Sequence, residues 1–164
     1  MEEDQDLAPL LKASYIAAMP EIVKTHALNS KAVRNTKSLS DTVGMTRLAI
    51  HLVRVEPGKE TTQFHFHHQE EEFIYILSGC GIAEIGDRFI EVAAGDFMGF
   101  TAPSLPHSLS NPFEEDLVYL MGGERRSFDV CDYPRLRQRQ VRMGSDRQLI
   151  NWDDMQPTPQ PPSP

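Results

Sequence analysis

Between Met45 and Met121 the chain consists of short runs of β-branched and aromatic residues, and Gly, Pro, Asn or Asp interrupts these runs at intervals of roughly ten residues. Strands joined by tight turns have this rhythm, which therefore predicts a β-sandwich or a barrel. The dipeptide Gly-Asp at positions 86–87 separates two of the runs, as the two-residue turn of a β-hairpin does. We expect strands at residues 46–55, 61–67, 73–78, 81–85, 88–92, 96–101, 107–111 and 116–121.

The length and composition fit one domain with short extensions, because 164 residues of which 40% are hydrophobic can build one core. Residues 1–44 are expected to form an N-terminal arm, in which residues 7–23 could be a short helix or an extended segment. Residues 45–123 are expected to form the barrel. A C-terminal extension, residues 124–155, should pack on or beside the barrel as a solvated hairpin rich in arginine. Residues 156–164 hold five of the twelve prolines and are expected to be a disordered tail.

Charge and hydropathy narrow the classes of partner. The net charge of −8 disfavours binding to nucleic acid or to anionic lipid headgroups. No strictly apolar run is longer than residues 73–77, which is far shorter than the roughly 20 residues of a membrane-spanning helix, so we expect no membrane partner. The acidic N-terminus lacks the basic and apolar parts of a secretory signal, and Cys80 and Cys131 are too few for a disulfide framework. We therefore expect a cytoplasmic protein with reduced thiols.

Four side chains with lone pairs occupy positions that suit a metal site. His65 and His67 are one residue apart on an expected strand, and the two-residue period of a strand places both imidazoles on one face. Glu72 opens the next expected strand, so a short turn can return its carboxylate to the same end of the sheet. His107 would supply a fourth donor if its strand lies beside this pair, which the spacing leaves open.

The first three donors stand in a segment that resembles the first sequence motif of the cupin superfamily. The segment PGKETTQFHFHHQEEEFIYILSG matches the pattern G-x5-H-x-H-x3,4-E-x6-G, except that six residues, and not five, separate Gly58 from His65. The distance to Gly79 selects Glu72 over the two acidic residues that precede it.

A later segment resembles the second cupin motif, G-x5-P-x-G-x2-H-x3-N. The segment GDFMGFTAPSLPHSLSN keeps the Gly, His and Asn, but it has seven residues before Pro103 and no Gly between Pro103 and His107. The resemblance covers about residues 46–122. It implies an all-β fold, the double-stranded β-helix or jelly-roll barrel, with one divalent metal held inside by His65, His67, Glu72 and His107. Three neutral imidazoles and a carboxylate suit Fe, Mn, Ni, Co, Cu or Zn rather than Ca or Mg.

Such a site suits catalysis, because an octahedral ion with four protein ligands keeps two positions free for a substrate that offers two oxygen atoms. We expect a metal-dependent enzyme on a small oxygen-rich molecule, of the sugar or sugar phosphate isomerase or epimerase type. A metal-dependent dioxygenase is one alternative, and a non-catalytic sensor or storage protein for a small ligand is another. Beyond the metal ligands, the sequence assigns no catalytic residue.

Strand parity also predicts an apolar outer face. If Glu72 points inward, Ile74 and Ile76 do so too, and Phe73, Tyr75 and Leu77 point outward. Burying an apolar side chain of this size stabilises the protein by about 1.5–3 kcal/mol, so we expect another part of the chain or another molecule to pack over these three side chains. Either the N-terminal arm or a second copy of the chain could provide it, and we expect a homodimer.

Overall fold

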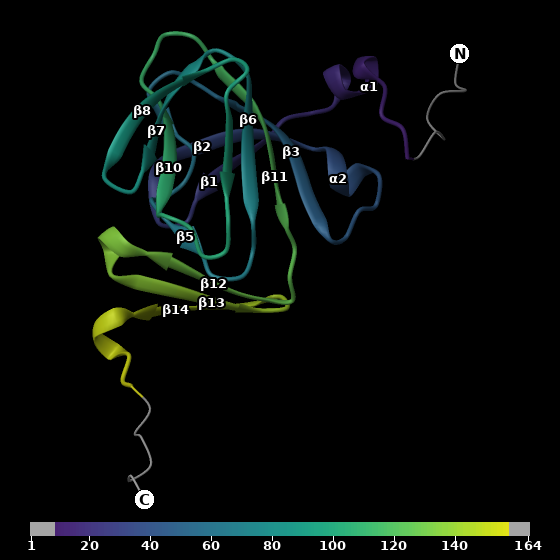
Figure 1. Cartoon of the computed structure of the whole chain (residues 1–164). Helices are drawn as coiled ribbons and strands as arrows, with labels where there is room; N and C mark the ends of the chain where they lie inside the picture. Colours follow the sequence, from purple (N-terminus) through teal and green to yellow (C-terminus); the bar gives the residue numbers. More distant parts are fainter. Residues whose placement is uncertain (1–8, 158–164) are drawn as a thin grey trace, which may run out of the picture.

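The chain folds into two β-sheets, which the computed structural model describes over residues 9–157 (Figure 1). Ten strands form the larger sheet: β1 (Ile22–His26), β2 (Asn29–Ser38), β3 (Leu48–Val55), β4 (Lys59–Glu60), β6 (Glu72–Ser78), β7 (Cys80–Ile85), β8 (Arg88–Ala93), β9 (Phe97–Phe100), β10 (His107–Asn111) and β11 (Leu117–Glu124). Four strands form the smaller sheet: β5 (Phe66–His67), β12 (Phe128–Tyr133), β13 (Gln138–Met143) and β14 (Asp146–Asn151). The tail expected at 156–164 lies outside the described residues from residue 158 onward.

The helical segments are short: α1 (Ala13–Ala18), α2 (Leu39–Thr42) and the 3₁₀ turns η1 (Pro134–Leu136) and η2 (Trp152–Asp154). None of the helices within residues 9–157 has the length and apolar character needed to cross a membrane.

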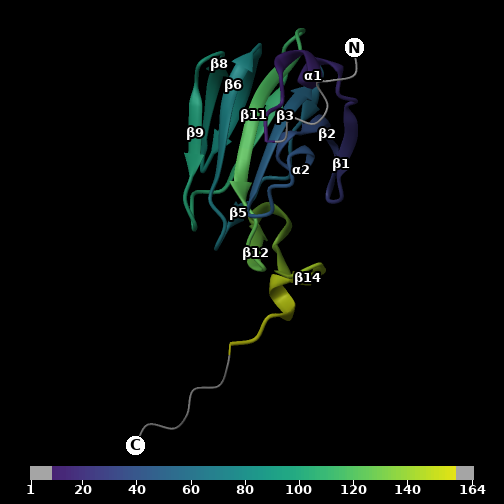
Figure 2. The same ribbon diagram turned by 90° about the vertical axis from the view of Figure 1, so that its right-hand side faces the viewer.

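The larger sheet curls into a jelly-roll barrel, as Figure 2 shows from the side. Its strands follow the order β8-β7-β10-β4-β2-β3-β11-β6-β9, and β1 pairs with β2 alone. These pairings are antiparallel, apart from one parallel contact between β2 and β4. The curl brings β6 against β8, although the two are far apart in the strand order. The all-β jelly-roll fold expected from the sequence is therefore confirmed.

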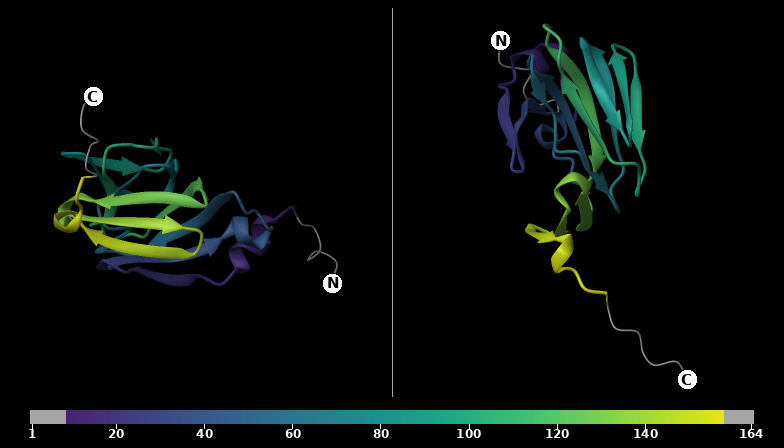
Figure 3. Two further views of the ribbon diagram at one scale, coloured as in Figure 1. Left: turned by 90° about the horizontal axis from the view of Figure 1, so that it is seen from below. Right: turned by 90° about the vertical axis from the view of Figure 1, so that its left-hand side faces the viewer.

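The smaller sheet lies across one end of the barrel, which Figure 3 shows from below. Its order is β14-β13-β12-β5, so β12 joins the C-terminal hairpin to the short strand that carries His67. The arginine-rich segment forms the hairpin of β13 and β14, with β14 at the edge of the sheet. The C-terminal extension is thereby placed beside the first expected metal ligands.

All but one of the expected strands are present, with ends that shift by at most three residues. The hairpin turn at 86–87 is present too, and Gly86 adopts a φ of 62° there. The expected strand at 61–67 is wrong as a continuous element, because only its last two residues belong to a strand, β5. His65 pairs with His107, whereas His67 pairs with Cys131 in the smaller sheet. The chain passes from one sheet to the other within two residues.

The N-terminal segment contributes two strands that the sequence analysis did not predict. β1 and β2 form a hairpin, and β2 also pairs with β3 inside the larger sheet. Residues 7–23, for which the sequence allowed either a helix or an extended segment, contain both α1 and the start of β1. Nζ of Lys37 in β2 donates to the carbonyl oxygens of Ile16 and Ala17, at 2.9 and 3.0 Å, which fixes α1 beside β2.

Strand parity divides the side chains of β6 between core and surface. Ile76 is fully buried, whereas Tyr75 and Leu77 keep 39% and 44% of their surface exposed. The expected orientation of these three side chains is confirmed. Further buried residues complete the core inside the barrel: Val53, Val55, Ala83, Val92, Met98, Phe100, Leu109, Leu117 and Tyr119.

Candidate metal centre

Two barrel strands bring an acidic side chain and an imidazole into contact. Glu72 begins β6 and His107 begins β10. The Nε2 atom of His107 lies 2.6 Å from Oε1 of Glu72. Both side chains are largely withdrawn from water, with exposures of 19% for Glu72 and 5% for His107. The adjacency that the sequence spacing left open is present in the fold.

His65 and His67 complete a cluster around the same carboxylate oxygen. The distances to Oε1 of Glu72 are 3.5 Å from Nε2 of His65 and 3.9 Å from Nε2 of His67. The two rings are nearly perpendicular, at 88°, with their centroids 5.1 Å apart. The fold thus brings together all four residues that the sequence analysis named as expected ligands.

A backbone carbonyl holds the other ring nitrogen of two of these histidines. Nδ1 of His65 lies 2.8 Å from the carbonyl oxygen of Gln63, and Nδ1 of His107 lies 3.2 Å from that of Leu105. Since a carbonyl oxygen only accepts hydrogen bonds, each Nδ1 carries a proton and donates it. When the imidazole is neutral in this tautomer, Nε2 has a lone pair that is available to a metal ion. When Nε2 carries a proton as well, it donates a hydrogen bond to the carboxylate of Glu72 instead. Metal-ligating histidines have this arrangement, with the second ring nitrogen bonded to an oxygen acceptor.

A carboxylate from the C-terminal extension holds the third histidine. Oδ2 of Asp129, in β12, lies 2.6 Å from Nδ1 of His67, and its Oδ1 accepts from the backbone N–H of Gln69 at 3.1 Å. Asp129 is only 3% exposed, so both bonds are made inside the protein. The sequence analysis missed Asp129, because no local pattern connects it with a histidine 62 residues earlier.

Burial and neighbouring charges shift the protonation equilibria of the cluster. Burial lowers the pKa of His65, and the nearby Glu72 offsets only part of this effect. Burial also lowers the pKa of His67, but the hydrogen bond to Asp129 and the charge of Glu72 outweigh it, so the pKa is raised overall. Burial raises the pKa of Glu72, yet the hydrogen bonds of His107 and His65 hold it well below its usual range. Glu72 is therefore ionised at neutral pH.

The donor set fits a divalent transition metal. Three imidazole nitrogens and one ionised carboxylate are the ligands that such ions prefer, whereas Ca and Mg prefer oxygen alone. Cys131 lies close enough to His65 and His67 to offer a sulfur atom instead. Burial, however, raises the pKa of this thiol to about 12, and a protonated thiol is a poor ligand. The nitrogen and oxygen donors therefore form the better candidate site.

The cluster opens into a cavity lined by side chains from several strands. The Phe100 ring stacks on the imidazole of His107, with the centroids 3.5 Å apart and the planes 8° from parallel. Arg34 and Tyr119 bring a guanidinium and a phenol to the same cavity. Burial raises the pKa of Tyr119, so its hydroxyl stays protonated. Neither Arg34 nor Tyr119 was named from the sequence.

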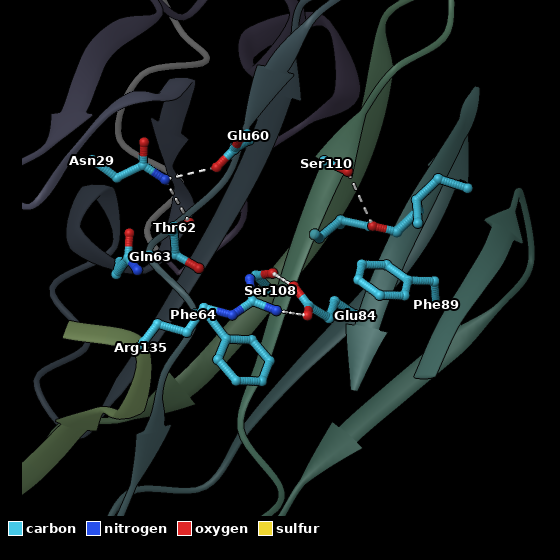
Figure 4. A pocket seen from close by; sticks show the side chains of 12 residues that line it. Asn29, Glu60, Thr62, Gln63, Phe64, Glu84, Phe89, Ser108, Ser110 and Arg135 are labelled. Atoms are coloured by element: carbon cyan, nitrogen blue, oxygen red, sulfur yellow. Dashed lines mark hydrogen bonds and ion pairs between the residues drawn. The ribbon is translucent and has the colours of Figure 1, made fainter. Parts of the chain in front are cut away.

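A second pocket, of about 260 Å³, adjoins the cavity into which the cluster opens (Figure 4). Thr62, Ser108 and Leu109 line both spaces. The polar lining of the second pocket consists of amides, hydroxyls, carboxylates and a guanidinium: Asn29, Glu60, Thr62, Gln63, Glu84, Ser108, Ser110 and Arg135. Figure 4 shows Ser108 and Arg135 beside the carboxylate of Glu84, and both donate hydrogen bonds to it.

A bulge in the barrel wall lies where the two spaces meet. Residues 62–64 stand opposite the single residue Ser108, because the chain bonds to β10 on either side of them, at Thr61 and at His65. The stretch from Gly58 to His65 is also where the sequence is one residue longer than the motif that it resembles. The longer stretch is accommodated as this bulge, directly before the first histidine of the cluster.

Known proteins resemble this chain over nearly all of its length. A model of the cupin domain matches residues 51–123. The solved structure of a "putative sugar phosphate isomerase" from Acidithiobacillus ferrooxidans is 42% identical to this chain. The likeness covers 92% of this chain and 97% of that one, with a TM-score of 0.90. None of the curated proteins compared with the chain matches it.

Two more distant structures share the fold. A "sugar phosphate isomerase from a cupin superfamily", from Silicibacter pomeroyi, is 22% identical, with a TM-score of 0.79 over 92% of this chain and 97% of that one. A "predicted oxalate decarboxylase" from Thermotoga maritima is 19% identical, with a TM-score of 0.56 over 68% of this chain and 96% of that one. The names of these two proteins refer to different reactions, as expected of a fold that supports several chemistries.

Proposed function

Since this chain belongs to the cupin superfamily, we propose that it binds one divalent transition metal and acts as an enzyme on a small oxygen-rich molecule. The reaction that we propose is the isomerisation or epimerisation of a sugar or sugar phosphate. The ion is one of Fe, Mn, Ni, Co, Cu and Zn. Its proposed ligands are the four clustered residues, His65, His67, Glu72 and His107.

The observation that carries this proposal is the common orientation of the three imidazoles. Each Nδ1 is bonded to an oxygen acceptor, and each Nε2 faces the carboxylate of Glu72. Histidines that served only to fill the core would not need this shared arrangement. The reaction type is supported by the 42% identity to the Acidithiobacillus ferrooxidans protein, which is named a "putative sugar phosphate isomerase".

The residues around the cluster have distinct tasks in the proposed enzyme. When bound, a divalent ion supplies Lewis acidity that polarises a carbonyl or hydroxyl oxygen of the substrate. Asp129 fixes the ring of His67, and Phe100 covers one face of His107 and keeps water from it. The hydroxyl of Tyr119, kept protonated by burial, can donate a hydrogen bond to a substrate oxygen. The polar pocket in Figure 4 offers further partners for hydroxyl groups.

The proposal is tested with the full chain, stripped of metal and loaded separately with each candidate ion. Isomerisation and epimerisation of a panel of sugars and sugar phosphates are then assayed. We expect turnover with at least one metal, loss of turnover in Glu72→Gln, and unchanged turnover in Glu71→Gln, which alters an exposed neighbouring carboxylate. Oxygen consumption would instead indicate a dioxygenase. Ligand binding without turnover would indicate a sensor or storage protein, and either result would overturn the isomerase proposal.

We also propose that two copies associate through the outer face of β6 and β9. Tyr75 and Leu77 are exposed on this face, and Phe97 keeps 64% of its surface exposed beside them. The other expected cover was the N-terminal arm, but α1 is bonded to β2, which is separated from β6 by two strands of the sheet. A second copy is therefore the cover that we propose for these apolar side chains.

A further inference from the structure

Arg34 brings a guanidinium into the cavity beside the four clustered residues, where it forms no ion pair with any carboxylate of the described residues. Its side chain lines the same cavity as Glu72 and His107. Among residues 9–157 the guanidinium forms no ion pair, and its partners there are Sδ of Met121, at 3.7 Å, and the phenol of Tyr119. Sulfur is a weak acceptor, and a partly buried cation normally has a charged partner. Among the described residues, the candidate site therefore holds a cation that has no ion-pair partner.

Two buried polar atoms near Arg34 also lack a hydrogen-bond partner. Thr36 follows two residues later on the same face of β2, and His51 lies on the neighbouring strand, β3. Neither Oγ1 of Thr36 nor Nδ1 of His51 has a partner within the described residues. His51 stands opposite Met121 in the sheet, and Met121 contacts Arg34. Arg34 therefore lies next to a part of the core in which buried hydrogen-bonding groups are left unsatisfied.

We propose that Arg34 binds a phosphoryl group of the substrate inside the barrel, at a subsite beside the four proposed metal ligands. This inference rests on the proposed function and narrows its substrate class to phosphorylated molecules. The charges of the groups at the site favour a phosphoryl group over a carboxylate. A bound divalent ion, the carboxylate of Glu72 and the guanidinium of Arg34 would together carry two positive charges, and a phosphate monoester, as a dianion at neutral pH, balances them. A guanidinium also matches the geometry of phosphate oxygens with two parallel N–H donors.

Inorganic phosphate is the probe for this subsite. It is titrated by calorimetry into the full chain at neutral pH and constant ionic strength, both with and without bound metal. Arg34→Gln removes the charge, Arg34→Lys keeps the charge but loses the paired donors, and Arg88→Gln is a control that removes an exposed arginine at the start of β8. We expect equal phosphate affinity in the wild type and Arg88→Gln, a loss of about tenfold or more in Arg34→Gln, and a smaller loss in Arg34→Lys.

Unchanged phosphate affinity in Arg34→Gln would overturn the inference, and so would equal affinity of the wild type for phosphate and acetate. If Arg34→Gln does not fold, Arg34→Lys tests the inference in its place. Weaker phosphate binding by Arg34→Lys than by the wild type would support the subsite, and equal binding would overturn it. Metal content, measured on the same samples, is expected to be unaffected in the Arg34 variants, and its loss would contradict the assignment. Phosphate binding that depends on Arg34 in a protein that takes up no metal would defeat the proposed function but support the phosphoryl subsite.

Discussion

The carboxylate of Asp129 lies 2.6 Å from Nδ1 of His67, and it reaches this position from β12, a strand of the smaller sheet. The match to the cupin domain model ends at residue 123, so this contact comes from outside the matched region. Because Asp129 accepts a hydrogen bond from Nδ1 of His67, the other ring nitrogen, Nε2, is the one that faces Glu72. The C-terminal extension is therefore part of the candidate metal centre.

We expect Asp129→Asn to weaken metal binding by about 10–100-fold, because a neutral amide no longer fixes and polarises the imidazole of His67 as a carboxylate does. Competition with a chromogenic chelator measures the affinity. Asp153→Asn is the matched control, since Asp153 is 76% exposed and lies outside the cluster. Equal affinities of Asp129→Asn and the wild type would contradict a supporting role for Asp129.

Metal affinity should fall as the pH is lowered. A histidine binds metal only in its neutral form, so protons compete with the ion. Because the pKa of His67 is raised, this competition should begin above about pH 6.5, the reference value for imidazole. Because the pKa of His65 is lowered, protonation of His65 should weaken metal binding only at a more acidic pH. Chelator competition between about pH 8 and pH 5 follows the decline, and an affinity that stays constant over this range would argue against histidine ligation.

Two glycines of the first motif should differ in their tolerance of alanine. Gly58 and Gly79 both have positive φ, at 75° and 76°, so each substitution costs about 1–2 kcal/mol in backbone strain. A Cβ at Gly58 would meet nothing within 4 Å, whereas at Gly79 it would collide with the backbone carbonyl of Asp116. Denaturant unfolding should show Gly79→Ala to be less stable than Gly58→Ala by roughly 1–3 kcal/mol. Similar stabilities would mean that this close approach is not maintained in solution.

The proposed dimer should be sensitive to a charge at its centre. Tyr75→Glu would bury an unpaired carboxylate in the contact and should shift the protein towards the monomer. Phe89→Glu is the control, because Phe89 keeps 69% of its surface exposed on β8, a strand that is not part of the proposed contact. Light scattering at micromolar concentration measures the mass, and a monomeric wild type would refute the dimer.

Local patterns were sufficient for most barrel strands but not for the N-terminal hairpin. The runs from residue 73 to residue 121 are short, rich in β-branched and aromatic residues and bounded by Gly, Pro or Asn, and these are properties of each segment alone. By contrast, Asn29–Ser38 contains just two hydrophobic residues, Ala32 and Val33, in ten. It is a strand because β1 and β3 pair with it, and such tertiary pairing leaves no pattern in a single segment.

The four clustered residues could be named from the sequence because motif spacing reports their strand positions. The expectation that His65 and His67 share one continuous strand was wrong, although both residues do reach the cluster. They converge because the chain changes sheets between them. Asp129 and Arg34 could not be found in this way, because their contacts with the site join strands that are remote in the sequence.

The central claim is that one divalent metal ion is held by His65, His67, Glu72 and His107, and elemental analysis tests it most directly. The protein is purified without a chelating resin, and metal is quantified per chain in the wild type, Glu72→Gln and the neighbouring control Glu71→Gln. We predict about one transition metal ion per chain in the wild type and in Glu71→Gln, and loss of most of it in Glu72→Gln. Metal content that remains the same in Glu72→Gln would contradict the assignment.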